Sequence, residues 1–379
     1  MNKIRVVQIG KYYYPCHGGM ESSLYSLVAG LKGEVDFEVI VSNTKPKTIV
    51  EEIDGVRILR LAQYGTLFSQ PINPSLFFHF QRLKADIVHM HLPNPLAVIF
   101  YLFVHPEGKL VISYHSDMVR QGFLGWIFMP YLKRILGLAD KIIITSLNLM
   151  DAYPILKGFR EKCVVIPHGI DLEAFKETSM AKAKAQDIKR KYNKPIVLFV
   201  GRLVYYKGLK YLLKAMVSVD AKLVVVGKGQ LESKLKSFAK RLNIGEKLFW
   251  AGDVSHEELI AYYYACDLLV LPSCFNSESF GLVVLEAQAC AKPVVSTNLP
   301  TGLATINLNE KTGFVVTPKD SHQLQIAINK LILSEDLCRE YGLNGRERVK
   351  QEYSRGLMCQ RFLALYAAIN NKQFSPLAE

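Results

Sequence analysis

The chain has 379 residues, 50% of them hydrophobic, which exceeds what one hydrophobic core usually serves and predicts two domains. Its net charge of +13 calls for an anionic partner, whereas the dispersed basic residues and the lack of an RNA-recognition motif argue against nucleic acid. Seven cysteines without a Cys-x-x-Cys pair, and no apolar run of about 18 residues, argue against a disulfide framework, a zinc site and a transmembrane helix.

Buried-strand patterns recur through the first half of the chain, with helical patterns between several of them. The first such run begins almost at the N-terminus and leads into a loop, which is unlike a signal peptide. Alternating strands and helices predict a parallel sheet covered by helices. The expected strands lie at 4–9, 37–41, 56–61, 86–90, 110–114, 141–145 and 163–167, and the clearest helices at 20–31 and 131–138.

The same pattern restarts after a Lys-rich stretch. Its expected strands lie at 195–201, 222–227, 247–252, 267–272 and 292–297, with a helix at 210–217. We therefore expect an α/β protein with two Rossmann-like, doubly wound domains facing each other across a cleft. The predicted N-terminal domain covers 1–170, the linker 171–194 and the C-terminal domain 195–356, and a helix at about 357–379 crosses back to the first domain.

The most informative motif is Glu278-Ser-Phe-Gly-Leu-Val-Val-Leu-Glu286, which follows a buried strand and opens a helix at 282–291. Free backbone N–H groups at Phe280, Gly281 and Leu282 and the helix dipole suit a phosphate, and glycine permits close approach. Each carboxylate accepts hydroxyl hydrogen bonds, so Glu278 and Glu286 can hold a sugar and a ribose. Two solvated surface carboxylates are the alternative.

Other polar residues follow predicted strands. Arg202 and Lys207 flank a strand-to-helix loop, where two cations can clamp a diphosphate, although surface charges often look alike. Gly18 and Gly19 open the first helix and allow close approach of a phosphate or an acceptor, or simply form a tight turn. His115 ends a buried strand in Tyr-His-Ser-Asp, where a cleft-edge position favours a catalytic role over a structural one.

Taken together, these motifs resemble the family 4 retaining glycosyltransferases of the GT-B fold over nearly the whole chain. The segments that carry the resemblance are Gly18-Gly-x-Glu21, His115-Ser-Asp117, Val165 to Asp171, Gly201-Arg-Leu with Lys207-Gly208, and Glu278-x7-Glu286.

The resemblance assigns roles to single residues. It implies that Arg202 and Lys207 bind the donor diphosphate, that Glu278 contacts hydroxyls of the transferred sugar, and that Glu286 contacts the ribose. His115 resembles the histidine near the sugar's C6 hydroxyl. Backbone at 280–282 would meet sugar and phosphate, and the loop of Gly18 and Gly19 would lie beside the diphosphate and the acceptor.

The resemblance extends to mannosyl- and rhamnosyltransferases of O-antigen and capsule assembly, through 115–121 and 300–307. GDP-mannose is therefore the first choice of donor, with a UDP-hexose as the alternative, and a polyprenyl-diphosphate-linked glycan is the expected acceptor. No Asp-x-Asp motif or metal-ligand spacing is present, so we expect no metal. Pyridoxal phosphate is not expected either, since it belongs to the phosphorylase alternative. Remote alternatives are an epimerase or phosphorylase on the same scaffold and a basic nucleic-acid-binding protein.

The stretch 120–134 mixes Phe123, Trp126, Phe128, Met129 and Tyr131 with basic residues. Such a mixture suits the head-group region of an anionic membrane, and an ordinary helix packing its aromatic side chains inward is the alternative. The membrane interpretation places the protein in the cytoplasm, peripheral on the inner face of the bacterial plasma membrane.

Overall fold

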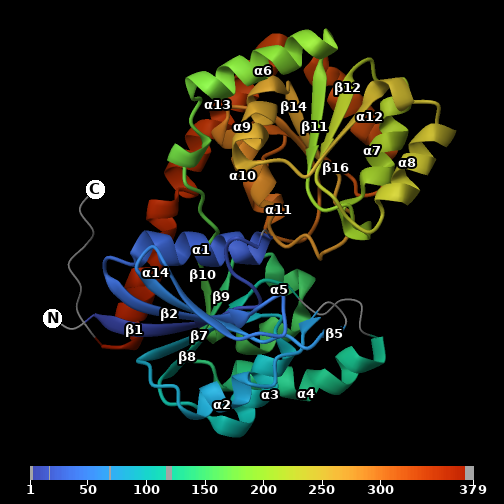
Figure 1. Ribbon diagram of the computed structural model, residues 1–379. Helices are drawn as coiled ribbons and strands as arrows, with labels where there is room; N and C mark the ends of the chain where they lie inside the picture. Colours follow the sequence, from blue (N-terminus) through green and yellow to red (C-terminus); the bar gives the residue numbers. More distant parts are fainter. Residues whose placement is uncertain (1–2, 17, 68–69, 117–121, 372–379) are drawn as a thin grey trace. The chain divides into compact units, whose positions relative to one another are not determined.

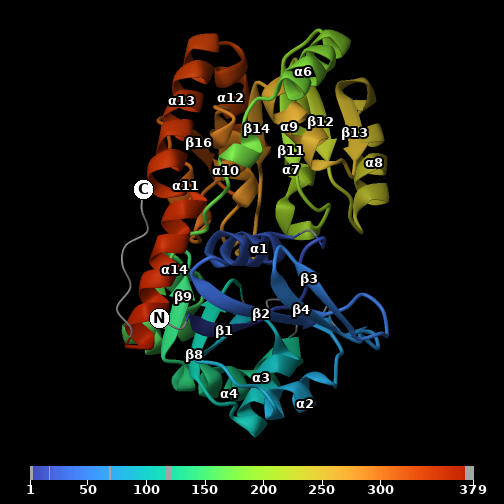
Figure 2. The same ribbon diagram turned by 60° about the vertical axis from the view of Figure 1, so that its left-hand side comes forward.

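The computed structural model describes residues 3–16, 18–67, 70–116 and 122–371, without the side chains at 122–124 and 126. The chain folds as two compact units (Figures 1 and 2). Unit 1 comprises residues 1–169 and 355–379, and unit 2 comprises residues 170–354.

Unit 1 contains an eight-stranded sheet with the order β10-β9-β8-β7-β1-β2-β4-β3, in which only β3 is antiparallel to its described neighbour. The strands are β1 (Ile4–Ile9), β2 (Val35–Ser42), β3 (Ile49–Ile53), β4 (Val56–Leu61), β7 (Ile87–Leu92), β8 (Lys109–Tyr114), β9 (Lys141–Ile144) and β10 (Cys163–Val165); β5 (Thr66–Leu67) and β6 (Gln70–Pro71) form a separate pair. All six residues of β7 are buried, as expected for a central parallel strand.

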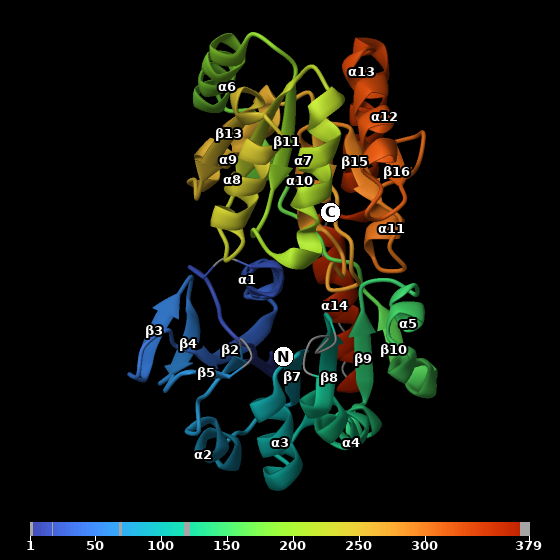
Figure 3. The same ribbon diagram turned by 90° about the vertical axis from the view of Figure 1, so that its right-hand side faces the viewer.

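Helices cover both faces of this sheet (Figures 1 and 3). One face packs against α1 (Gly19–Leu31) and α14 (Arg355–Ile369), which also contact each other. The other face packs against α2 (Leu76–Gln81), α3 (Pro95–Val104), α4 (Gly122–Leu138) and α5 (Leu149–Ala152). Each face has its own apolar core, so residues that alternate along one strand enter different cores.

Unit 2 contains a six-stranded, fully parallel sheet with the order β13-β12-β11-β14-β15-β16. The strands are β11 (Ile196–Val200), β12 (Lys222–Val226), β13 (Leu248–Gly252), β14 (Leu268–Leu271), β15 (Val294–Thr297) and β16 (Gly313–Val316). Its α-helices are α6 (Ser179–Tyr192), α7 (Leu209–Ala215), α8 (Glu232–Arg241), α9 (His256–Ala265), α10 (Leu282–Ala289), α11 (Leu303–Ile306), α12 (Ser321–Ile332) and α13 (Glu335–Glu352). The expected α/β class with two Rossmann-like sheets is confirmed.

The prediction of a linker at 171–194 is wrong. Most of this stretch forms α6, which begins after a Thr178 side-chain cap and packs against α9. Ala181 and Ala185 are buried in the core of unit 2, at 1% and 5% exposed. The lysines that suggested a linker belong to the solvent-facing side of an amphipathic helix.

Four described strands were absent from the sequence prediction, namely the two-residue strands β5 and β6 and the edge strands β3 and β16. β3 is an edge strand whose residues are exposed or half-buried, so it lacks the apolar run that marks a buried strand. β16 is a four-residue edge strand that begins at Gly313. A further difference is α4, which starts at Gly122 rather than at residue 131.

Candidate active site

The loop between β14 and α10 brings Glu278 against a lysine from another loop. Oε2 of Glu278 lies 2.6 Å from Nζ of Lys207 and accepts a 2.8 Å hydrogen bond from Oγ of Ser273. Both charged residues are buried, with 7% of Glu278 and 9% of Lys207 exposed. Because both contacts use Oε2, Oε1 has no hydrogen-bond partner among the described residues and is the oxygen left for a ligand hydroxyl.

Lys207 comes from the loop that follows β11 and includes the single turn η3 (Tyr205–Lys207). Gly208 follows it with φ +67°, and a Cβ there would lie 2.0 Å from the carbonyl oxygen of Pro272. This close crossing of two loops requires glycine. Arg202 is exposed and donates a 3.1 Å hydrogen bond to the hydroxyl of Tyr206. The two cations therefore differ, since Lys207 is buried and paired whereas Arg202 lies at the surface.

The helix α10 begins at Leu282, directly after Gly281, whose φ of +90° lies in the left-handed region. A Cβ at Gly281 would lie 3.0 Å from Leu303 and 3.1 Å from Leu271. No described side chain caps this helix, so its first backbone N–H groups and the positive end of its dipole suit an anion. The Phe280 ring is buried and lies edge-on to the ring of Tyr353.

Glu286 lies one turn into α10 and is half-buried beside α9. The hydroxyl of Tyr263 donates a 2.6 Å hydrogen bond to Oε2 of Glu286. Burial raises the pKa of Glu286, while the bond from Tyr263 and the positive charges of His256 and Lys207 act in the opposite direction. Hydroxyl donors of a ligand at Oε1 would further stabilise the ionised carboxylate.

In unit 1, Gly18 and Gly19 lie at the start of α1. A Cβ at Gly18 would lie 2.2 Å from Oε2 of Glu21, whereas a Cβ at Gly19 would meet nothing within 4 Å. The Glu21 carboxylate therefore lies over this helix end and already complements its dipole. That negative charge makes the α1 terminus less suited to a diphosphate than the uncapped terminus of α10.

His115 follows β8 and is 6% exposed. Its ring lies nearly parallel to the rings of His91 and His168, with ring centroids 5.3 Å and 5.4 Å away. Nε2 of His115 lies 3.0 Å from Nδ1 of His91, and Nδ1 of His168 lies 2.7 Å from Oγ of Ser23 on α1. Burial lowers the pKa of His115 to about 4 and that of His168 to about 3, so both rings are neutral at neutral pH.

Sequence reasoning missed the residues that surround His115. His89 and His91 alternate along β7, and Gln8 of β1 lies beside them on the sheet. Two histidines two residues apart in a completely buried strand face the same side, and this alternation was a readable signal. The partner from α14, Tyr366, had no local signal because it is 277 residues from His89 in the sequence.

No group of three or more His, Cys, Asp or Glu side chains in the described part of the chain is arranged to hold a metal ion. His89, His91, His115 and His168 are joined by hydrogen bonds and ring contacts instead.

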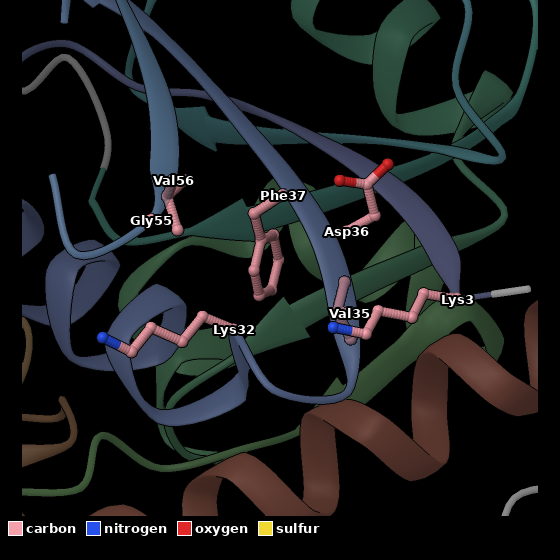
Figure 4. Close-up of a pocket in the computed structure, with 7 residues that line it drawn as sticks. All are labelled: Lys3, Lys32, Val35, Asp36, Phe37, Gly55 and Val56. Atoms are coloured by element: carbon pink, nitrogen blue, oxygen red, sulfur yellow. The ribbon is translucent and has the colours of Figure 1, made fainter. Parts of the chain in front are cut away.

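A hollow of about 490 Å³ opens elsewhere in unit 1, lined by residues that include Lys3, Lys32 and Asp36 (Figure 4). It lies at the amino ends of β1, β2 and β4, opposite to the strand ends where parallel sheets bind ligands.

The predicted membrane segment 120–134 is only partly described. Arg120 and the side chains of Phe123 and Trp126 lie outside the described residues. Phe128 and Met129 pack against the core of unit 1, as in the inward-packing alternative, whereas Tyr131 is 42% exposed. Within the described residues, none of the helices has the length and apolar character needed to cross a bilayer.

Two regions of the chain match protein-family models. Residues 17–174 match "Glycosyltransferase Family 4" and residues 181–348 match "Glycosyl transferases group 1". The chain is 30% identical to O-antigen chain mannosyltransferase C of Escherichia coli, covering 97% of this chain and 99% of that protein. It is also 30% identical to D-rhamnosyltransferase WbpZ of Pseudomonas aeruginosa, covering 89% of this chain and 88% of that protein.

Among solved structures, the sucrose-phosphate synthase of Thermosynechococcus elongatus superposes with a TM-score of 0.81 at 25% identity. The match covers 96% of this chain and 98% of that one, so it includes both units. The predicted GT-B fold and the predicted family are thereby confirmed. The chain belongs to the group 1, family 4 glycosyltransferases and is a hexosyltransferase of the GT-B fold.

Proposed function

We propose that this enzyme transfers a hexosyl group, with retention of configuration, from a nucleoside-diphosphate sugar to a polyprenyl-diphosphate-linked glycan in O-antigen or capsule synthesis. GDP-mannose is the first choice of donor and a UDP-hexose the alternative. The observation that carries the proposal is the buried pair of Lys207 and Glu278 beside the uncapped N-terminus of α10. The mannosyl and rhamnosyl relatives, one of them acting on O-antigen chains, support the choice of sugar and polymer.

In this proposal different residues of unit 2 bind different parts of the donor. Lys207, Arg202 and the first N–H groups of α10 stabilise the charge that develops on the leaving diphosphate. Oε1 of Glu278 accepts a hydroxyl of the transferred sugar, and Oε1 of Glu286 accepts a ribose hydroxyl. The bond from the anomeric carbon to the diphosphate breaks, the bond to the acceptor oxygen forms, and a leaving phosphate oxygen takes the proton of the acceptor hydroxyl. Because the two cations and the helix dipole stabilise the leaving diphosphate, the proposed step needs no metal, and it uses no pyridoxal phosphate.

A panel of GDP-, UDP-, ADP- and dTDP-sugars in a thermal-shift assay tests the donor. A ligand that binds only the folded state at 100 times its Kd stabilises it by about 2.7 kcal/mol, so we expect GDP-mannose to give the largest shift. Glu286→Gln is the matched control, because a hydrogen bond to a charged group contributes about 1.5–3 kcal/mol and its loss weakens donor binding about 10- to 100-fold. The proposal fails if no nucleotide sugar shifts the wild-type protein or is turned over.

We also propose that unit 1 docks on an anionic membrane through the helices that cover one face of its sheet. Every residue of α3 is apolar or aromatic, and Phe103 on it is 73% exposed. Phe78 on the neighbouring α2 is 61% exposed, and Ile127 and Tyr131 on α4 are each 42% exposed. The exposed basic residues nearby in sequence are Arg82, Lys84, Lys133 and Arg134. Apolar side chains beside cations suit an anionic head-group layer, where the lipid-linked acceptor would reside.

Sedimentation with vesicles tests this docking. We expect Phe78→Ser combined with Phe103→Ser to lower binding to anionic vesicles several-fold, because two exposed aromatic side chains no longer insert. Leu333→Ser is the control, since Leu333 is 85% exposed but lies in unit 2. Binding should also weaken with salt. Equal binding of the wild type to neutral and anionic vesicles, or an equal loss in Leu333→Ser, would contradict the proposal.

A further inference from the structure

A continuous chain of side-chain hydrogen bonds connects Ser113 to His115 and includes Tyr366 of α14. Nε2 of His91 lies 2.9 Å from Oε1 of Gln8, and the Gln8 amide nitrogen donates a 3.1 Å hydrogen bond to the hydroxyl of Tyr366. That hydroxyl lies 2.7 Å from Nδ1 of His89, whose Nε2 lies 2.8 Å from Oγ of Ser113. All of these residues, like His115 at the other end, are buried.

The amide of Gln8 determines where the protons lie, because its oxygen only accepts hydrogen bonds and its nitrogen only donates. Nε2 of His91 must carry the proton that it donates to Gln8. In a neutral ring, Nδ1 of His91 is then an acceptor, so Nε2 of His115 carries the proton that they share. His115 is consequently left with an unprotonated Nδ1.

We propose that Gln8 and His91 are positioning residues that hold His115 as its Nε2–H tautomer, so that the lone pair of Nδ1 accepts a hydrogen bond from a hydroxyl of the bound sugar. The proposal deepens the transferase function given above and rests on it only for the identity of the ligand. Nε2 of His115 is hydrogen-bonded to His91, and Nδ1 of His115 has no hydrogen-bond partner among the described residues. Nδ1 is therefore the ring nitrogen that remains for a ligand.

Two further observations favour positioning over proton transfer along the chain. The chain ends at Ser113, which is only 4% exposed, and none of the bonds described leads from it to solvent. Burial also lowers the pKa of His89 to about 3 and that of His91 well below its usual value, which makes charged intermediates costly. The nearly parallel rings of His91 and His168 hold the plane of the His115 ring, and the hydrogen bond from His115 to His91 sets its tautomer.

Nitrogen-15 NMR of histidine-labelled protein, recorded without substrate between pH 6 and 8, tests the tautomer directly. The His115 signals are assigned by their loss in His115→Ala. In the wild type we expect protonated Nε2 and unprotonated Nδ1 at His115. A wild-type His115 that carries its proton on Nδ1, or exchanges between both tautomers, overturns the proposal whether or not Gln8→Leu folds.

Gln8→Leu extends the test to catalysis. Without the Gln8 oxygen, His91 can protonate Nδ1 and donate to His115, which would convert Nδ1 of His115 from an acceptor to a donor. We expect both tautomers in the spectrum and a fall in kcat of about 10- to 100-fold, the size of a lost hydrogen bond to substrate. Ser113→Ala, at the far end of the chain, should keep the wild-type tautomer and a kcat within about twofold.

The outcomes separate this inference from the proposed function. A Gln8→Leu protein that keeps the wild-type tautomer, or that changes tautomer with unchanged kcat, contradicts the positioning role. If no nucleotide sugar is turned over by the wild type, the transferase proposal fails while the NMR result still decides the tautomer.

Discussion

Lys207→Met is expected to abolish nearly all transferase activity and to destabilise unit 2. Removal of one preorganised donor to a developing charge typically lowers kcat by about 10²- to 10³-fold. The same change leaves the buried carboxylate of Glu278 without its 2.6 Å partner, and breaking a buried ion pair costs about 3–5 kcal/mol. Steady-state kinetics and urea unfolding measure the two effects separately.

The double variant Lys207→Met with Glu278→Gln separates catalysis from stability. It removes both charges, so no isolated charge is left buried, and we expect most of the lost stability to return. Activity should stay low because the lysine is still absent. Arg202→Gln provides a second comparison, since Arg202 is exposed and its loss should lower activity with a stability change within about 0.5 kcal/mol. Recovery of activity in the double variant would show that Lys207 acts only on the fold.

Residues that are close in sequence carried most of what could be predicted about unit 2. The run from Glu278 to Glu286 contains a glycine with positive φ and a helix start within nine residues, and the buried strand β14 ends at Leu271, shortly before it. These features depend on local backbone geometry, so the pattern of residue types was sufficient. The pairing of Glu278 with Lys207 was not predictable in this way, because two loops 71 residues apart create it.

The polar network of unit 1 could not be predicted from residues that are close in sequence. His115 was identified from its position after a buried strand, but its partners come from β1, β7 and α14. Only the order of strands, with β7 between β1 and β8, places Gln8, His91 and Ser113 on neighbouring strands. The prediction of a linker at 171–194 was wrong for a local reason instead. A helix with a narrow apolar face buries only a few small side chains, and its lysines dominate its composition.

The second large effect that we expect is a loss of stability of unit 1 at acidic pH. Four buried histidines in unit 1, namely His89, His91, His115 and His168, have lowered pKa values because burial disfavours their charged forms. In the unfolded chain the same rings titrate near 6.5. As pH falls through 6.5, the unfolded state binds protons that the folded state does not bind. Stability must therefore decrease as pH falls, with no contribution from these groups well above pH 6.5.

The size of the effect follows from the same linkage. At pH 5 an unfolded histidine has bound its proton while a folded one with a pKa of 3 or 4 has not, which costs about 2 kcal/mol per ring. The three rings with such values, those of His89, His115 and His168, together give roughly 6 kcal/mol, comparable with the whole stability of an ordinary domain. The lowered pKa of His91 acts in the same direction. Unit 2 provides an internal control. Its Glu286 has a raised pKa, so the folded state takes up that proton more readily and acid relieves part of its burial cost.

Hydrogen exchange resolved by segment, at pH 7 and pH 5 and corrected for the intrinsic rate, distinguishes the two units. We expect protection of β7 and β8 to fall by orders of magnitude at pH 5, while protection of β11 and β14 changes much less. His89→Gln removes one of the four titrating rings and should reduce the slope of stability against pH between 5 and 6 by about a quarter. Equal loss of protection in both units would assign the acid response to overall charge repulsion, because the four histidines act on unit 1 alone.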